Sequence, residues 1–199
     1  TGEKMELADY AFLSAPKVDA YNHLGNKLST IVAASDANAS EDIVHGVAMQ
    51  VAAMAPIALD ADHVPAEVKE HELKVAVEKT QQDEVNKAVE NALRKAGINP
   101  SHVDTDEHIE SNTAKGWLTP EQAQQARNIK TNVAQEAAQN INMKKVEMIA
   151  QGRLQKFLKE STLVEQIYVM SEEKELVKDV LRKANVTITD FRRVTLNVD

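Results

Sequence analysis

The stretch from Val64 to about Glu160 most constrains what this chain can fold into, because it has the composition of one long helix going out and one coming back. About thirty residues after Val64 are rich in Glu, Lys, Ala and Val and nearly free of Gly and Pro, which favours a helix. We expect this helix to end at Gly97, since Arg94 and Lys95 suit its negative end and glycine suits a left-handed cap. The pattern predicts an antiparallel helical hairpin.

The returning helix has a clear start signal. Thr119, Pro120 and Gln122 match a capping box with proline at the first helical position. Apolar residues spaced three and four apart predict a narrow contact stripe on each helix, made of Val68, Val75, Val85, Val89 and Leu93 on the first and Ala123, Ala126, Ile129, Val133 and Ala137 on the second. Such thin stripes are typical of two helices packed on each other. The residues between them, 98–118, are expected to form an enlarged tip with a further short helix.

The segments before the hairpin predict strands and one helix. Short β-like runs occur at 5–13 and 18–23, and the β-branched cluster at 28–34 is the best strand signal in the chain. Ser40 is expected to cap a helix that Pro56 closes.

After the hairpin, a short helix is expected to start at Ser171 and a final strand to lie within 186–198. The first and last segments would then share one sheet. The predicted fold class is α+β, a small antiparallel sheet with packed helices that is interrupted by the long helical hairpin. Residues 1–63 and 161–199 would form this discontinuous core, and residues 64–160 the coiled-coil insertion.

Composition narrows the classes of function. A net charge of −8 argues against nucleic-acid binding by the whole molecule, because phosphate binding needs a basic face. The lack of cysteine excludes disulfides, thiol catalysis and Cys-ligated zinc, and is consistent with a cytoplasmic protein. The most apolar run, 47–59, is too short to span a bilayer, so we expect no membrane partner. Because the chain does not begin with methionine, we expect a fragment.

The residues predict no catalytic, cofactor or metal site. The histidine pairs that an enzyme would need for a metal are His63/His71 and His102/His108. The first two stand two helical turns apart, which is too far for one ion. The acidic cluster 104–108 lacks the glycine and spacing of a calcium loop. The glycines are isolated, so no phosphate-binding loop is present. The residues alone indicate an interaction module.

Five motifs in order resemble the elongation factor Ts family. They are Tyr21-Asn22-His23 followed by LSTIVAAS at 28–35, DIVHGVAMQVAAMAP at 42–56, VPAEV at 64–68, GRLQKF at 152–157 and LVEQIYV at 163–169. The resemblance covers the C-terminal core subdomain and the coiled-coil arm of that family, and the arm here is longer than the common version. The family's Thr-Asp-Phe-Val motif, whose Asp-Phe pair disturbs the magnesium and phosphate site of elongation factor Tu, is not matched. Thr189-Asp190-Phe191 continues with two arginines and fits the family's last strand instead.

The resemblance implies a guanine-nucleotide exchange factor. It would bind elongation factor Tu, mainly domain 3 of Tu, and promote GDP release in the full-length protein, without a cofactor. His23 and Val169 carry over as contacts with Tu. Tyr21 and Tyr168, which stand beside them in the same motifs, are expected to bind the partner as well. Without the family, His23 reads equally well as an ordinary strand histidine, and Val169 reads as a core residue.

Other residues are expected to support structure. Gly152, Arg153 and Phe157 would pack the arm against the core. Met49 and Met54 could be adaptable contacts with a partner or could pack within their helix, and packing is favoured. The alternative function is a structural coiled-coil module that forms homodimers and has no exchange activity.

Overall fold

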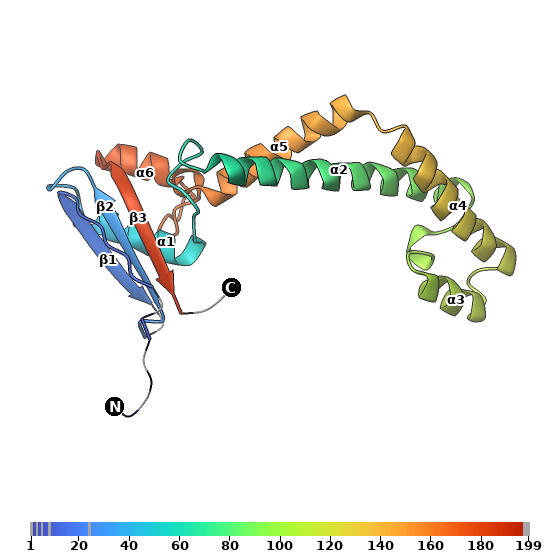
Figure 1. Ribbon diagram of the computed structural model, residues 1–199, viewed down its shortest axis with the longest axis horizontal. Helices are drawn as coiled ribbons and strands as arrows, with labels where there is room; N and C mark the ends of the chain where they lie inside the picture. The colour runs from blue at the N-terminus through green and yellow to red at the C-terminus, as the bar shows by residue number, and fades with distance from the viewer. Residues whose placement is uncertain (1, 3, 5, 8, 24, 197–199) are drawn as a thin grey trace. The chain divides into compact units, whose positions relative to one another are not determined.

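The computed structural model describes residues 2, 4, 6, 7, 9–23 and 25–196. The chain divides into two compact units, residues 1–69 with 155–199 and residues 70–154. The elements are β1 (Lys17–His23), β2 (Leu28–Ala34), α1 (Glu41–Met54), α2 (Ala66–Lys95), η1 (Pro100–His102), α3 (Asp106–Ala114), α4 (Pro120–Gln139), α5 (Met143–Ser161), η2 (Leu163–Glu165), α6 (Val177–Ala184) and β3 (Ile188–Thr195) (Figure 1). The predicted α+β class is confirmed.

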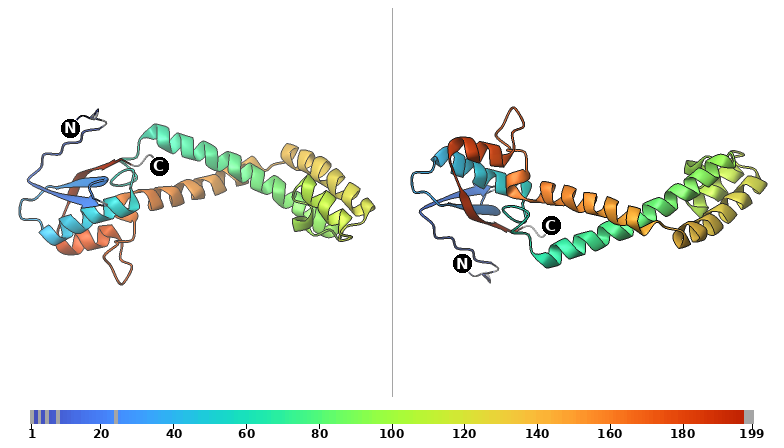
Figure 2. Two further views of the ribbon diagram at one scale, coloured as in Figure 1. Left: turned by 90° about the horizontal axis from the view of Figure 1, so that it is seen from below. Right: turned by 90° about the horizontal axis from the view of Figure 1, so that it is seen from above.

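The first unit is built on a three-stranded antiparallel sheet in the order β1-β2-β3. Its central strand has the predicted bounds, because β-branched and apolar residues suit a strand that is covered by neighbours. Helix α1 packs on one face of the sheet (Figure 2). Where the two meet, the buried Thr30 hydroxyl donates a 2.8 Å hydrogen bond to the carbonyl of Ala48. The core contains Val32, Ala34, Ala39, Val44, Val47, Ala48, Val51, Leu163, Tyr168, Val177, Leu181, Val186 and Ile188.

The run at 5–13 was predicted to be β-like, and this is wrong for its described residues, none of which lies in a strand. Met5 and Ala8 lie outside the described residues. Tyr10 and Phe12 are exposed, so the run has apolar side chains but no surface on which to bury them. A strand needs such a surface more than it needs propensity.

One predicted helix start is confirmed in position, and another is wrong. Ser40 precedes α1 but makes no side-chain capping bond. Ser171 does not start a helix, because its hydroxyl accepts a 3.1 Å bond from the amide of Glu175 and Lys174 adopts a positive φ of 58°. Serine side chains favour such turns as readily as helix caps. Helix α6 therefore begins only at Val177.

The returning part of the predicted hairpin is split into α4 and α5 rather than being one helix. Asparagines cause the break between Gln139 and Met143. The Asn140 side chain donates to the carbonyl of Glu136 at 2.9 Å, and the Asn142 side chain accepts from the amide of Lys145 at 3.2 Å. Asparagine competes with helical hydrogen bonding in this way, so it ends one helix and starts the next.

The predicted ends of the hairpin helices are confirmed. The Thr119 hydroxyl accepts from the amide of Gln122, whose side chain accepts from the amide of Thr119, so the capping box is complete. Gly97 has a φ of 73°, and the amide of Ile98 donates back to the carbonyl of Leu93 at 2.9 Å. These two bonding patterns are the usual start and stop of a helix.

The contact stripe on α2 is shifted from the predicted one. Val75 is exposed, whereas Ala76 and Thr80 are buried. The Thr80 hydroxyl donates to the carbonyl of Ala76 at 2.6 Å, which allows a polar residue to be buried there. The tip has its own small apolar core of Leu93, Ile98, Val103, Ile109, Leu118, Ala123 and Ala126.

Candidate functional site

The residues predicted to contact a partner meet around one open pocket of the first unit. This β1–α1 pocket has a volume of about 500 Å³ and is lined by Tyr21, His23, Met49, Ala52, Ala53, Val169 and Met170. It is formed by the end of β1, one face of α1 and the irregular 167–170 segment, which lie far apart in the sequence. Three of the four predicted contact residues, Tyr21, His23 and Val169, are therefore brought together.

The aromatic wall of the pocket comes from alternation along β1. Residues two apart on a strand share a face, so Asp19, Tyr21 and His23 follow one another there. The Tyr21 hydroxyl lies 2.8 Å from His23 Nδ1, and the two ring centroids are 5.7 Å apart. His45 of α1 packs edge-on against Tyr21 at 5.9 Å, and its Nδ1 lies 2.9 Å from Asp19 Oδ2. His23 is thus held by a neighbour while its ring remains exposed.

The 167–170 segment supplies the apolar wall. Val169 and Met170 are 43% and 58% exposed, whereas Tyr168 before them is only 8% exposed. The amide of Tyr168 donates to the carbonyl of Glu175 at 2.8 Å. Tyr168 was predicted beside Val169 as a partner contact, but the structure places its side chain in the core. It acts as an anchor from which the following two side chains project.

Gly46 makes room for that anchor. A Cβ added to this glycine would lie 1.8 Å from the Tyr168 hydroxyl oxygen and 2.9 Å from the adjacent ring carbon. The ring can pack on α1 only because residue 46 has no side chain. Burial, together with the negative charge of Asp42, raises the pKa of the Tyr168 phenol, so the anchor remains neutral.

Sequence reasoning did not assign Ala52, Ala53 or Met170 to this site, and it favoured packing over partner contact for Met49. Met49 and Met54 were expected to pack within the helix, yet Met49 lines the pocket and Met54 is exposed. Ala53 follows Met49 by one helical turn, and this spacing was the available signal for a shared face. No sequence pattern indicated that Met170 would line the pocket, because its exposure depends on how Tyr168 is buried.

The three residues expected to support the arm lie on α5. Gly152 has open space around the position of an added Cβ. The Arg153 guanidinium bonds to Asp83 of α2, and this hydrogen bond lowers the pKa of the Asp83 carboxyl. Phe157 is half-buried. Arg153 thus ties the two arms of the hairpin to each other.

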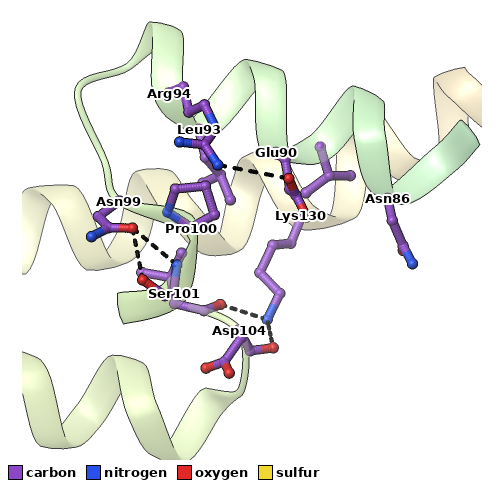
Figure 3. Close-up of a pocket in the computed structure, with 11 residues that line it drawn as sticks. Asn86, Glu90, Leu93, Arg94, Asn99, Pro100, Ser101, Asp104 and Lys130 are labelled. Atoms are coloured by element: carbon purple, nitrogen blue, oxygen red, sulfur yellow. Dashed lines mark hydrogen bonds and ion pairs between the residues drawn. The ribbon is translucent and has the colours of Figure 1, made fainter. Parts of the chain in front are cut away.

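A second pocket, of about 470 Å³, lies at the arm tip (Figure 3). Lys130 Nζ donates to the carbonyls of Val103 and Asp104, each at 2.9 Å, and Asn99 Oδ1 accepts from the hydroxyl of Ser101 at 2.8 Å. Lys130 therefore already stabilises the backbone at Val103 and Asp104. Trp117 is exposed elsewhere on the tip, beside His102.

Within residues 9–23 and 25–196, no three His, Cys, Asp or Glu side chains are grouped so that they could hold a metal ion. No helix in the described part of the chain is long and apolar enough to cross a membrane.

Comparison with known proteins then places the chain. The family model described as elongation factor TS matches residues 1–198. The chain belongs to the elongation factor Ts family. The elongation factor Ts of Phocaeicola vulgatus is 49% identical over 202 residues, which cover all of this chain and 60% of that protein. The elongation factor Ts of Bacteroides fragilis is 48% identical over all of this chain and 61% of its own length. The chain thus spans about 60% of these curated relatives.

Proposed function

We propose that this protein binds elongation factor Tu through the β1–α1 pocket and serves as part of a guanine-nucleotide exchange factor in translation. Family membership supports the choice of partner. In this proposal residues 1–63 and 161–199 form the Tu-binding core, and residues 64–160 form the arm. The protein would act in the cytoplasm through protein contacts, without a reaction, cofactor or nucleic-acid contact of its own.

The observation that carries the proposal is the convergence of Tyr21, His23 and Val169 on one pocket. Val169 and Met170 leave apolar surface exposed next to an aromatic ring and an imidazole. Protein interfaces are enriched in aromatic residues and methionine at their centres, and such side chains carry much of the binding energy. The pocket therefore has the chemistry of a protein-docking site.

In the full-length protein, preferential binding of nucleotide-free Tu would promote GDP release. A protein that binds nucleotide-free Tu more tightly than GDP-bound Tu must weaken the affinity of Tu for GDP by the same factor. The chain has no match to the family's Thr-Asp-Phe-Val motif. We therefore expect this chain alone to bind Tu while GDP release remains near its basal rate.

Calorimetric titration of the chain into GDP-free Tu tests the proposal. Val169→Asp should weaken binding at least about 30-fold, equivalent to about 2 kcal/mol, because the interface would bury an unpaired charge. Val75→Asp is the matched control, since Val75 of α2 is also 43% exposed but lies outside the pocket.

The control should bind Tu like the unmodified chain. Equal loss of affinity in the two variants, or failure of the folded chain to bind Tu, would contradict the proposed site.

A further inference from the structure

A buried pair of glutamines lies directly beneath the 167–170 segment. Gln50 of α1 is fully buried, and Gln166 is almost so. Buried amides are costly unless each polar atom has a partner, so their bonds show what they hold in place.

Gln50 bonds to the backbone of the segment at two points. Its Nε2 donates to the carbonyl of Ile167 at 3.1 Å, and its Oε1 accepts from the amide of Val169 at 2.7 Å. The backbone groups fix the orientation of the side-chain amide, because a carbonyl can only accept and an amide N–H can only donate. One side chain therefore bridges the residues on either side of Tyr168.

Gln166 completes the network. Gln50 Nε2 also donates to Gln166 Oε1 at 3.1 Å, and Gln166 Nε2 donates to the carbonyls of Met54 at 3.4 Å and Glu160 at 3.0 Å. Met54 is the last residue of α1, where helix carbonyls lack helical partners. Every donor and acceptor of the two amides is thereby used, which links the end of α1 to the start of the segment.

We propose that Gln50 is a positioning residue that sets Val169 and Met170 at the partner-facing surface; this role rests on the proposed binding of Tu. The segment needs such a support because Ile167, Val169 and Met170 are all exposed and gain little from packing. The ring of Tyr168 anchors one point, and backbone bonds join its amide to the carbonyl of Glu175 at 2.8 Å and its carbonyl to the amide of Ser171 at 3.0 Å. Those bonds leave the Ile167 carbonyl and the Val169 amide to Gln50. The two bonds from Gln50 therefore fix the backbone groups on either side of Tyr168, from which the exposed side chains project.

Gln50→Met tests the role, because methionine has a similar length and forms neither bond. We expect amide hydrogen exchange at Val169 to become at least about 10-fold faster and the affinity for GDP-free Tu to fall at least about 10-fold, since lost hydrogen bonds of this kind are worth about that factor. Thr30→Val is the matched control. It removes another buried hydrogen bond to α1, the one that Ala48 accepts, but it does not touch the segment.

The outcomes separate the positioning role of Gln50 from the proposed binding of Tu. If amide hydrogen exchange at Val169 is unchanged in Gln50→Met, the positioning role of Gln50 is overturned. If hydrogen exchange becomes faster but the affinity for Tu is unchanged, Gln50 has only a structural role and the proposal is overturned as well. Equal effects in Thr30→Val overturn the specific role as well. If the unmodified chain does not bind Tu, the proposed function fails. Amide hydrogen exchange at Val169 then still decides whether Gln50 holds the 167–170 segment in place. If Gln50→Met does not fold, amide hydrogen exchange in the unmodified chain decides instead. The Val169 amide must then be protected although its side chain is exposed, and an unprotected amide overturns the role of Gln50.

Discussion

Gly46→Ala should destabilise the first unit, although alanine usually favours a helix. The new Cβ would start 1.8 Å from the Tyr168 hydroxyl oxygen. Ordinary contact needs about 3.5 Å, so the oxygen must move by roughly 1.7 Å or the ring must leave its site. Loss of a buried aromatic ring costs about 3–5 kcal/mol, and the helix gains about 0.5–1 kcal/mol from replacing glycine. We expect a net loss of about 2–4 kcal/mol in the free energy of unfolding.

Urea unfolding followed by far-ultraviolet circular dichroism measures this loss. The single tryptophan, Trp117, lies in the second unit, so its fluorescence follows that unit separately. Gly152→Ala is the matched control, because this helical glycine has open space around it. It should gain about 0.5–1 kcal/mol.

A double variant identifies the cause. Tyr168→Phe removes the clashing oxygen and leaves the ring carbon at 2.9 Å, which a small shift can relieve. Gly46→Ala combined with Tyr168→Phe should therefore be more stable than Gly46→Ala alone. If Gly46→Ala is as stable as the unmodified chain, or if Tyr168→Phe rescues nothing, the close approach of the ring to α1 is refuted.

Three further predictions concern the second unit. Thr119→Ala removes the capping box and should lower the stability of the arm by about 1 kcal/mol in urea unfolding followed by Trp117 fluorescence, while Thr119→Ser should not. Lys130→Met loses two hydrogen bonds to backbone carbonyls and should destabilise the tip by about 1–3 kcal/mol in the same assay; an unchanged midpoint would contradict this. The hydrogen bond from His108 holds the pKa of the Asp104 carboxyl below its ordinary 3.8, so the stability this pair contributes is present above that pH and is lost as the pH falls through the folded-state value. His108→Ala should raise the pKa of Asp104 in a carboxyl NMR titration, and an unmoved titration would show that the pair does not form.

The parts of the fold that the sequence predicted depend on signals within a few residues. The capping box at Thr119 and the left-handed glycine at position 97 are local patterns, and both are present. The β-branched run at 28–34 is equally local and forms β2 with those bounds. Each signal requires only its immediate neighbours, so a single sequence is enough to recognise it.

The differences arise where distant residues decide. Ser171 looked like a helix cap, but its hydroxyl stabilises a turn instead. Val75 suited the apolar stripe of α2, yet it is exposed and the smaller Ala76 next to it is buried. Tyr168 looked like a surface contact, and only its fit against Gly46 reveals it as an anchor. Periodicity and propensity do not encode which side chain will find space on another element.

Methyl NMR mapping of the chain bound to GDP-free Tu tests the central claim most directly. Labelled methyl groups of Met49, Ala53, Val169 and Met170 lie at the β1–α1 pocket, and Met148 of α5 provides an exposed reference in the second unit. We predict that the four pocket signals broaden or shift together on addition of Tu. Binding that leaves all four unchanged would contradict the proposed docking site.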